Sequence, residues 1–255
     1  MAASGAKSGQ EGGRAPQALG ARSAGELRSI SDYAWEFLRR NPDYRADFLR
    51  SAAGARGEEG GALDPRWGLL FPADPASPPG SAEVYWDPNV APGLVIPLAV
   101  NHSAAGRPAP RLTPASAPRH AGEDLHLQMG GGLQLLLRGE ARPEGRLVVV
   151  LALDEDFGLR VRAVQALHRA VSGGRAPRSR LTRAQRARLD HCLQALDGAL
   201  ERQSYRTIAQ TLFGSGVVQR ETWKTSSARA VTIRLVRSGK ALMRGGYLKL
   251  LRGGL

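Results

Sequence analysis

Polar and basic side chains that suit contacts with DNA recur at helical spacing between residues 204 and 238. Arginine can form paired hydrogen bonds with guanine, and serine or threonine can contact several bases. Lysine and arginine also hold phosphates, as do the free amides at a helix N-terminus. The predicted DNA-binding residues are Arg206, Thr207, Arg220, Lys224, Thr225, Ser226, Arg229, Arg234 and Arg237.

Two predicted helices position these residues. A period of 3.6 residues places an inward stripe on residues 204–213, formed by Tyr205, Ile208, Ala209 and Leu212. The second helix starts near residue 223 and runs to 238, with an inward stripe of Ala228, Val231 and Leu235. The glycines at 214 and 216 allow a sharp turn between the helices, so residues 204–238 have helix-turn-helix spacing. We expect Thr225, Ser226 and Arg229 to read bases and the remaining cations to hold the DNA backbone.

Basic charge is concentrated in the same half of the chain. Residues 158–255 contain 20 of the 36 Lys and Arg but only four acids, a formal charge of +16, whereas residues 1–157 hold 16 bases and 19 acids. Such a surface attracts polyanions, and neutralised phosphates release counterions, so nucleic acid is the expected partner. RNA ranks second to DNA, because Tyr205 and Phe213 are assigned to the core rather than to base stacking. The simplest alternative is a basic domain that docks on acidic protein or ribosomal RNA.

The residue patterns predict no enzyme, no cofactor and no metal site. The glycines at 130–132 lack the Gly-Lys-Ser/Thr of a phosphate-binding loop, and the five histidines show no metal-ligand spacing. His191 and Cys192 are neighbours, which on a helix places them ~100° apart, a poor geometry for a nucleophile and its base. Asp154 and Asp156 could gather Mg²⁺ in a nuclease, our third functional hypothesis, but an acidic turn after a strand is far commoner.

The pattern of elements predicts an α+β fold. A short N-terminal helical hairpin precedes a small antiparallel β meander, and a C-terminal all-helical basic domain contains the helix-turn-helix. Candidate strands are residues 67–71, 83–86, 94–100, 125–129, 133–138 and 147–153, and the last three form the meander. Between them, residues 101–122 are rich in Pro, Ala and Arg and are predicted to form a loop. The expected divisions are a disordered leader at 1–27, a helical segment at 28–60, a β-rich region at 66–153 and the helical domain at 154–255.

Helix signals are clearest at the two ends of the chain. Ser31 is predicted to cap a first helix that Asn41-Pro42 ends, and residues 43–53 form a second. In the C-terminal half, residues 158–172 form a helix, and Thr182 with Gln185 makes a capping box. That box opens a helix reaching about residue 201, with Leu189, Leu193, Leu196 and Leu200 inward. Ser204 caps the shorter helix described above, and a last short helix finishes the chain.

Four aromatic residues gather in the N-terminal hairpin: Tyr33, Trp35, Phe37 and Tyr44. The more common explanation is that they are buried, because aromatics in an amphipathic pattern usually belong to a core. The alternative is a docking surface for another protein. That alternative underlies our second functional hypothesis, a protein-binding, antiactivator-like regulator that sequesters or recruits a partner.

The location predicted for the chain is the cytoplasm. The single cysteine cannot form an intrachain disulfide, which fits a reducing compartment. No apolar run approaches the ~20 residues that span a bilayer, and the Gly-, Ala- and Ser-rich start has no apolar segment typical of a signal peptide.

Two segments also resemble known families. Residues 32–44, with the run Trp-Glu-Phe-Leu-Arg-Arg-Asn-Pro, resemble the transcriptional regulator-like domain of proteobacterial proteins. Residues 205–209 and 212–214, together with Trp223 and the Gly-Gly-Tyr at 245–247, resemble the RovC-type DNA-binding domain, formerly a domain of unknown function. Trp86-Asp87-Pro88 is similar to the β portion of that family.

The resemblance implies a bacterial transcription regulator, most similar to activators that control excision of integrative and conjugative elements or secretion loci. It implies DNA binding, oligomerisation and activation, with double-stranded DNA and a second copy of the chain as partners. The resemblance also suggests an antiactivator protein and RNA polymerase as further partners. The location that it suggests for the chain is the bacterial nucleoid. Because one domain of this size reads only a few base pairs, we expect dimers or larger oligomers on repeated half-sites.

Overall fold

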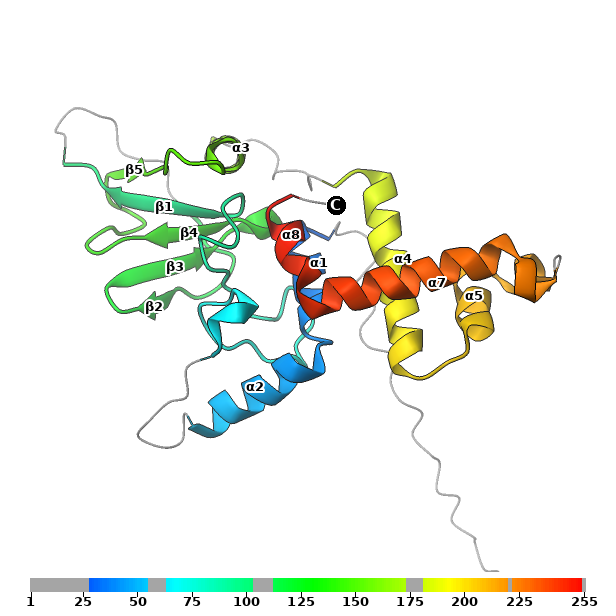
Figure 1. Ribbon diagram of the computed structural model, residues 1–255. Helices are drawn as coiled ribbons and strands as arrows, with labels where there is room; N and C mark the ends of the chain where they lie inside the picture. The colour runs from blue at the N-terminus through cyan, green and yellow to red at the C-terminus, as the bar shows by residue number, and fades with distance from the viewer. Residues whose placement is uncertain (1–27, 55–62, 103–111, 173–180, 220–221, 254–255) are drawn as a thin grey trace, which may run out of the picture.

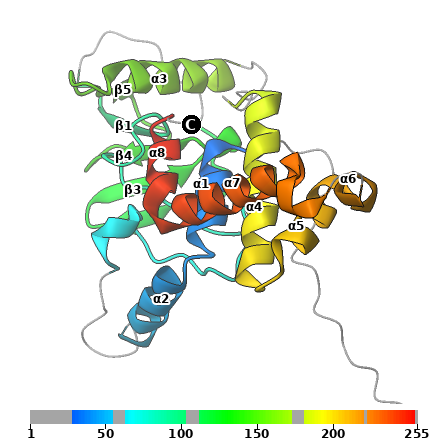
Figure 2. The same ribbon diagram turned by 45° about the vertical axis from the view of Figure 1, so that its right-hand side comes forward.

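The computed structural model describes residues 28–54, 63–102, 112–172, 181–219 and 222–253. A β-sheet with one covering helix lies at one side of the molecule, and a group of helices projects from the other (Figure 1). The first and last helices meet between these two parts, a relation that the turned view in Figure 2 also shows. The α+β class is confirmed, with a helical C-terminal region.

The sheet contains five strands in the order β2-β3-β4-β1-β5. Their bounds are β1 Val95–Val100, β2 Arg119–Ala121, β3 Asp124–Gln128, β4 Gln134–Leu137 and β5 Leu147–Val149. A tight turn at Gly130–Gly132 joins β3 to β4, as the glycines predict. Strand β1 runs parallel to β4, and its other neighbour β5 is antiparallel.

The predicted meander is therefore wrong in its last step. Strand β4 has β3 on one side and β1 on the other, so β5 pairs with the free edge of β1 instead of following β4. The strands predicted at 67–71 and 83–86 are also absent, apart from one bridge between Leu69 and Trp86. Residues Pro65–Trp67 form a 3-10 turn capped by Asp64, and the buried Trp67 indole donates a hydrogen bond to Asp47.

Helix α1 (Ile30–Leu38) lies in the middle of the molecule, and α2 (Pro42–Gly54) follows it after a break at Asn41. The predicted N-cap, Ser31, is wrong by two positions. Ser29 caps α1 and forms a reciprocal box with Asp32. Ser31 is buried instead, where its hydroxyl accepts a 2.8 Å hydrogen bond from the Trp86 indole.

Helix α3 (Phe157–Val171) covers one face of the sheet. Its Ala163, Ala166 and Leu167 join a hydrophobic cluster with leucines of β1, β3 and β4. The small alanines let the helix approach the sheet closely, and Val164 and Val171 are only partly buried at the edge of that cluster. The helical period of the sequence predicts Val164, Leu167 and Val171 on one face, and the buried face is rotated from it towards the alanines.

Five helices make up the C-terminal part. They are α4 Arg183–Leu200, α5 Tyr205–Phe213, α6 Ser215–Gln219, α7 Ser227–Ala241 and α8 Tyr247–Leu251. The capping box at Thr182 and Gln185 is confirmed, as is the Ser204 cap. Leu200 does not face inward as predicted, because the helix ends there and its side chain is 44 % exposed. A π-helical turn, Leu242–Gly246, links α7 to α8.

One hydrophobic cluster crosses the expected domain divisions. It contains Tyr33 and Trp35 of α1, Trp86 before the sheet, Leu196 of α4 and Tyr247 of α8. Side-chain hydrogen bonds add to this cluster, because Tyr247 donates to the carbonyl of Trp67 at 3.0 Å and Asn41 donates to that of Met243 at 3.0 Å. The helical segment at 28–60 therefore shares its core with both later regions. In the described part of the chain, no helix is long and apolar enough to cross a membrane.

Candidate nucleic-acid interface

Helix α7 begins later than the sequence pattern predicts. Residues Trp223–Thr225 form a 3-10 turn, and α7 proper starts at Ser227 with Ser226 as its N-cap. The Ser226 hydroxyl accepts from the amide of Arg229 at 3.2 Å and donates to the carbonyl of Trp223 at 3.1 Å. Ser226 is only 5 % exposed, so the prediction that it points outward to read bases is wrong. The Ser226 hydroxyl caps α7, so the group that was predicted to contact DNA is used within the protein.

The inward stripe of α7 is displaced by about one residue from the predicted one. Ala228, Thr232, Val236 and Gly239 are buried, while Val231 and Leu235 are only partly buried. The buried Thr232 donates its hydroxyl to the carbonyl of Ala228 at 2.7 Å, which satisfies it within the helix. The shift leaves Arg229, Arg234 and Arg237 exposed, as the sequence predicts.

Helix α5 lies against α7 and also contacts α4. Its buried residues are Ile208 and Ala209, and Ile208 packs with Ala195 and Val236. Arg206 and Thr207 in its first turn are exposed, and the Ser204 hydroxyl accepts from the Thr207 amide at 3.1 Å. Tyr205 is 44 % exposed, so its assignment to the core is wrong: it lies in the first turn, before the helix reaches the hydrophobic cluster.

Two glycines let α4 approach its neighbours. A Cβ on Gly239 of α7 would lie 2.7 Å from the Cys192 carbonyl oxygen of α4. Likewise, a Cβ on Gly198 of α4 would lie 2.8 Å from Ile208 of α5. Helix α4 is thus the support on which α5 and α7 are placed, and the closeness of both contacts fixes their positions.

The connection between α5 and α7 differs from a simple helix-turn-helix. Residues 214–226 separate the two helices and include α6 and the 3-10 turn, whereas a helix-turn-helix has a turn of ~3–4 residues. Gly214, with φ 85°, ends α5 as the sequence predicts. The arrangement is a three-helix unit of α4, α5 and α7 with an elaborated connection.

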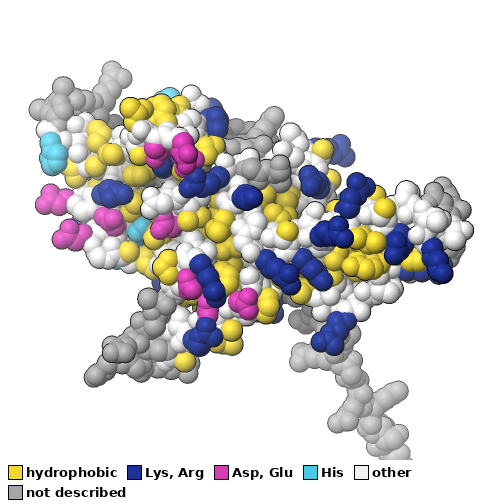
Figure 3. All heavy atoms as spheres, in the orientation of Figure 1, with side chains coloured by type: hydrophobic (Ala, Val, Ile, Leu, Met, Phe, Trp, Pro, Cys, Tyr) yellow, Lys and Arg dark blue, Asp and Glu magenta, His cyan; other side chains and the backbone are white. Residues whose placement is uncertain are grey.

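The exposed cations on α5, α7 and the turn before α7 pair with no acid among the residues that the structure describes. Arg206, Lys224, Arg229, Arg234 and Arg237 are exposed, and none forms an ion pair with another described residue. Figure 3 shows Lys and Arg side chains over the α5 and α7 end, while the acidic side chains in that view lie towards the sheet and α2. The resulting field favours an anionic partner.

The predicted DNA-binding residues occupy three places on the unit. Arg206 and Thr207 lie at the start of α5; Lys224, Thr225 and Arg229 lie around the start of α7; Arg234 and Arg237 lie further along α7. The structure therefore groups Lys224, Thr225 and Arg229 at one helix end, where free backbone amides favour anions. Arg220 lies outside the described residues.

Residues that position the unit were missed in the sequence. Asp197 of α4 accepts two hydrogen bonds from the Arg40 guanidinium, at 2.5 and 2.9 Å, and Asp190 accepts from Tyr33 at 2.9 Å. Arg28 also pairs with Asp190 at 3.3 Å. Asp190 and Asp197 are two of only four acids in residues 158–255, and their spacing of seven puts them on one face of a helix. That spacing was the signal that could have identified them.

The same ion pairs extend into the buried end of α1. Burial opposes ionisation of Glu36, but the Arg40 and Arg39 guanidiniums outweigh it and lower the pKa of that carboxyl. Burial alone would lower the pKa of Arg40, yet Asp197 and Glu36 together raise it. Glu36 and Arg40 therefore stay charged. The acids of α4 hold α1 in place, and in the described residues they form no ion pair with the α5 and α7 cations.

Acidic side chains in the turn after β5 also form ion pairs. Asp154 pairs with Arg160 at 2.7 Å, and Asp156 pairs with Arg252 at 2.9 Å. The hydrogen bond from Arg160 lowers the pKa of Asp154. Within the described ranges, no group of three or more His, Cys, Asp or Glu could hold a metal ion. His191 contacts Phe213 edge to face, and Cys192 is buried, which raises the pKa of its thiol.

The aromatic residues of the N-terminal hairpin are buried, as the more common explanation predicts. Tyr33 and Trp35 are each 1 % exposed, and Phe37 and Tyr44 are fully covered. The Trp35 indole donates to the carbonyl of Ser77 at 3.0 Å, and its ring meets Tyr44 edge to face. The docking surface on which the protein-binding alternative was based is therefore not available on the molecule.

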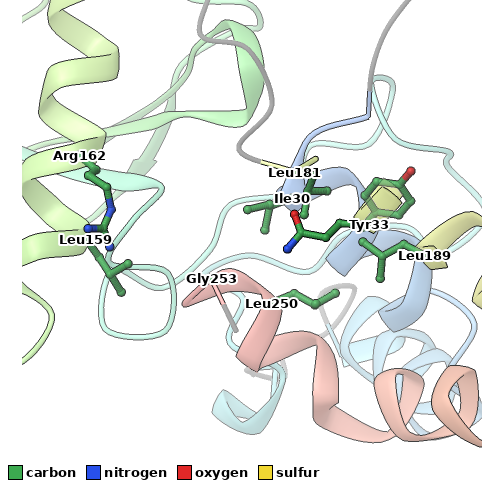
Figure 4. Close-up of a pocket in the computed structure, with 9 residues that line it drawn as sticks. Ile30, Tyr33, Leu159, Arg162, Leu181, Leu189, Leu250 and Gly253 are labelled. Carbon is green, nitrogen blue, oxygen red and sulfur yellow. The ribbon is translucent and has the colours of Figure 1, made fainter. Parts of the chain in front are cut away.

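A small cavity lies away from the predicted interface. Its volume is about 160 Å³, and it opens between α1, α3, α4 and the end of α8 (Figure 4). Most lining side chains are apolar, including Ile30, Leu159, Leu181 and Leu250, and Arg162 lies at one side. None of its lining residues belongs to the predicted DNA-binding set.

Comparison with known families matches two segments of the chain. Residues 150–252 match the RovC-type domain described as "T6SS, Transcription factor, DNA binding domain". Residues 21–72 match the proteobacterial transcriptional regulator-like domain. Both family resemblances are confirmed. No individual curated protein matches the chain.

The two matches support a DNA-binding transcriptional regulator with DNA as its partner. Neither family is an enzyme family. The match to the DNA-binding family contains all of α3 to α8, and so includes the exposed cations of α5 and α7. The regulator-like match contains α1 and α2, together with Arg28 and Arg40, which flank α1 and pair with α4.

Proposed function

We propose that the chain is a sequence-specific DNA-binding transcription activator, acting at a mobile-element excision or secretion locus. The observation that carries the proposal is the group of exposed cations on α5, α7 and the turn before α7, which form no ion pair with another described residue. They lie inside a segment that matches a transcription-factor DNA-binding domain. Their charge supplies affinity for phosphates, and side chains that reach base edges supply sequence preference.

In this proposal the start of α7 enters the major groove. Thr225 and Arg229 contact base edges, because both are exposed at the end of the helix where the amides favour anions. Arg234 and Arg237 hold phosphates from α7, and Lys224 does so from the 3-10 turn before it. Arg206 and Thr207 hold phosphates from α5. Arg220 belongs to the same phosphate-binding group. Ser226 acts as the cap that orients Arg229 rather than as a base contact.

Activation implies further partners, which we propose on the same basis. Several copies of the chain bind repeated half-sites, since one three-helix unit covers few base pairs. The regulator-like segment then presents this assembly to RNA polymerase or to an antiactivator protein. Such a role places the protein in the bacterial cytoplasm, at the nucleoid.

The assignment of roles is tested by two substitutions on one helix end. Arg229→Ala should reduce the preference for specific over random duplex by ~1–3 kcal/mol, because a base contact is lost. Lys224→Ala should weaken binding to all sequences alike and reduce the slope of log K against log salt by about 0.9, one phosphate contact. Fluorescence anisotropy with both duplexes across a salt series measures both quantities.

Equal losses for Arg229→Ala and Lys224→Ala on both duplexes would contradict these roles. Glu201→Ala is the matched control, because Glu201 is exposed beside the same unit and hydrogen-bonds only within its own turn, to Gln203. Its removal should leave sequence preference unchanged.

A further inference from the structure

The cavity between α1, α3, α4 and the end of α8 has a mainly apolar wall. Leu181, Leu189 and Leu250 line it, and all three are buried. The ring of Tyr33 adds an aromatic surface. Its hydroxyl points away from Leu250 in Figure 4 and donates to Asp190 at 2.9 Å. Such a wall stabilises a bound molecule by removing apolar surface from water.

Two polar side chains also line the cavity, and both have free hydrogen-bond donors. Arg162 of α3 is exposed and forms neither an ion pair nor a hydrogen bond with any residue that the structure describes. Gln185 of α4 accepts the Thr182 amide at 2.9 Å through its side-chain oxygen, while its NH2 group donates to no described residue. A guanidinium and an amide NH2 group are donors only, so the cavity favours a ligand with acceptor atoms. A negatively charged acceptor suits Arg162 best.

The acids near the cavity leave Arg162 available. None of the described residues that line the cavity is acidic. Asp190, which the Tyr33 hydroxyl contacts, pairs with Arg28 at 3.3 Å. The charge of Arg162 is therefore not neutralised by a described side chain and can pair with a ligand.

The volume of the cavity, about 160 Å³, limits the ligand to a small molecule. An apolar protein cavity of about 150 Å³ accepts benzene, whereas sites for drug-sized ligands measure roughly 300–1,000 Å³. A single ring or a chain of about six carbons therefore matches the apolar part. The free donors add one anionic group to this description, and a carboxylate forms paired hydrogen bonds with a guanidinium.

The cavity also lies where the two family-matched segments meet. Ile30 and Tyr33 belong to the segment that matches the regulator-like domain. Leu159 and Gln185 belong to the segment that matches the DNA-binding domain. A ligand in the cavity therefore contacts both segments, and ligand sites are common at such junctions.

We propose that this cavity binds a small carboxylate with an apolar body, of the size of benzoate or hexanoate. The carboxylate pairs with the Arg162 guanidinium and accepts from the Gln185 amide, and the apolar body packs on Tyr33, Leu189 and Leu250. The site is separate from the predicted DNA-binding residues, none of which lines the cavity. The inference does not depend on the DNA-binding proposal.

Titration of the full chain without DNA, followed by protein NMR chemical shifts, tests the proposal with benzoate and hexanoate as probes. We expect a dissociation constant on the order of 1 mM or lower for at least one of them. Benzyl alcohol and 1-hexanol keep the apolar body but lose the charge, and should bind at least about fivefold more weakly. Arg162→Gln should weaken carboxylate binding at least about fivefold and leave alcohol binding unchanged.

Two further variants separate the charge of the site from its space. Gln185→Glu keeps an acceptor for the Thr182 amide, so the capping box survives, but its carboxylate should repel the probe acids and not the alcohols. Leu159→Phe enlarges a side chain of the wall and should weaken binding of acids and alcohols alike. Arg169→Gln is the matched control, because Arg169 is exposed about two turns further along α3 and does not line the cavity. It should bind both acids as the wild type does.

Several results would overturn the proposal. Shifts that stay unchanged with both acids at about 10 mM, ten times the expected dissociation constant, would do so. Acids that bind no more tightly than the alcohols would contradict the role of the charge, as would equal effects of Arg162→Gln and Arg169→Gln. Because both arginines are exposed, these two variants should keep the wild-type melting temperature within a few degrees. DNA binding, measured separately on short duplexes, reports on the other proposal.

Discussion

Ser226 illustrates how a single side chain can matter to the interface without touching DNA. Its buried hydroxyl accepts a hydrogen bond from the backbone amide of Arg229. The side chain of Arg229 is exposed and is proposed to read bases. Ser226→Ala should lower the free energy of unfolding by ~0.5–2 kcal/mol, the usual cost of losing an N-cap. Urea denaturation followed by circular dichroism measures this.

Ser226→Thr is the control for this prediction, because threonine keeps a capping hydroxyl. It should recover most of the lost stability. If alanine at 226 left stability unchanged but reduced sequence preference as strongly as Arg229→Ala, the side chain would be a base contact and the capping account would be wrong.

Individual residues show what local sequence can predict. The cap at Thr182 followed from Gln185 three positions later, and the cap at Ser204 followed from the serine before a helical pattern; both are present. The cap of α1 was misplaced although Asp32, three positions after Ser29, was a local signal for a capping box. Ser31 is instead bonded to Trp86, 55 residues away in sequence. Tyr205 fits a helical stripe, yet the helix end leaves it exposed.

At the scale of elements, the crossing of α4 and α7 depends on Gly239. Because a Cβ there would meet the Cys192 carbonyl oxygen at 2.7 Å, Gly239→Ala must push α7 away from α4. We expect a loss of ~1–3 kcal/mol in the free energy of unfolding, as for other overpacked sites. Thermal and urea denaturation measure the change.

Gly216→Ala is the matched control, since nothing lies within 4 Å of a Cβ at that position. It should change stability by less than ~0.5 kcal/mol. A Gly239→Ala protein as stable as Gly216→Ala would mean that α4 and α7 do not approach as closely as described.

The buried end of α1 gives a prediction about pH. The pKa of Glu36 is lowered in the folded chain by Arg40 and Arg39, against the effect of burial. Its contribution to stability is therefore complete above the unfolded pKa of ~4.3 and is lost as pH falls through that value towards the lower folded pKa. Denaturation at pH 7, 5, 4 and 3 should show this loss in the wild type.

Glu36→Gln should be less stable at pH 7 and should lose less stability on acidification. Glu123→Gln, at an exposed position, serves as the control and should follow the wild-type curve. Parallel curves for the wild type and Glu36→Gln would contradict a stabilising, charged Glu36.

The order of strands was the least predictable feature of the fold. Residues 95–100, 124–128, 134–137 and 147–149 each have a local strand pattern, and the glycine turn identifies β3 with β4 as a hairpin. Nothing local indicates that β1 inserts beside β4, because the contact is between segments nearly 40 residues apart. Likewise, the side chain of Trp67 bonds to a distant carboxyl, that of Asp47, although Asp64 and Pro65 mark the 3-10 turn itself locally.

On the scale of the whole molecule, α1 connects the sheet to the helical unit. It contacts α8 and α4, and its flanking arginines occupy two of the four acids in residues 158–255. The imbalance of charge was visible in the sequence, and so was the expectation of a nucleic-acid partner. That the acids of α4 face α1, leaving the α5 and α7 cations unpaired, required the three-dimensional arrangement.

The proposal that this surface reads DNA sequence is tested most directly by competitive binding. Purified protein would be offered duplex fragments from its own genomic neighbourhood against random duplex, at salt from ~50 to 200 mM, where binding through phosphates alone weakens steeply. We predict that one fragment stays bound at the higher salt and is preferred by ~10³ or more over random duplex. Binding that weakens equally for every fragment would contradict a sequence-reading regulator and leave a general polyanion-binding surface.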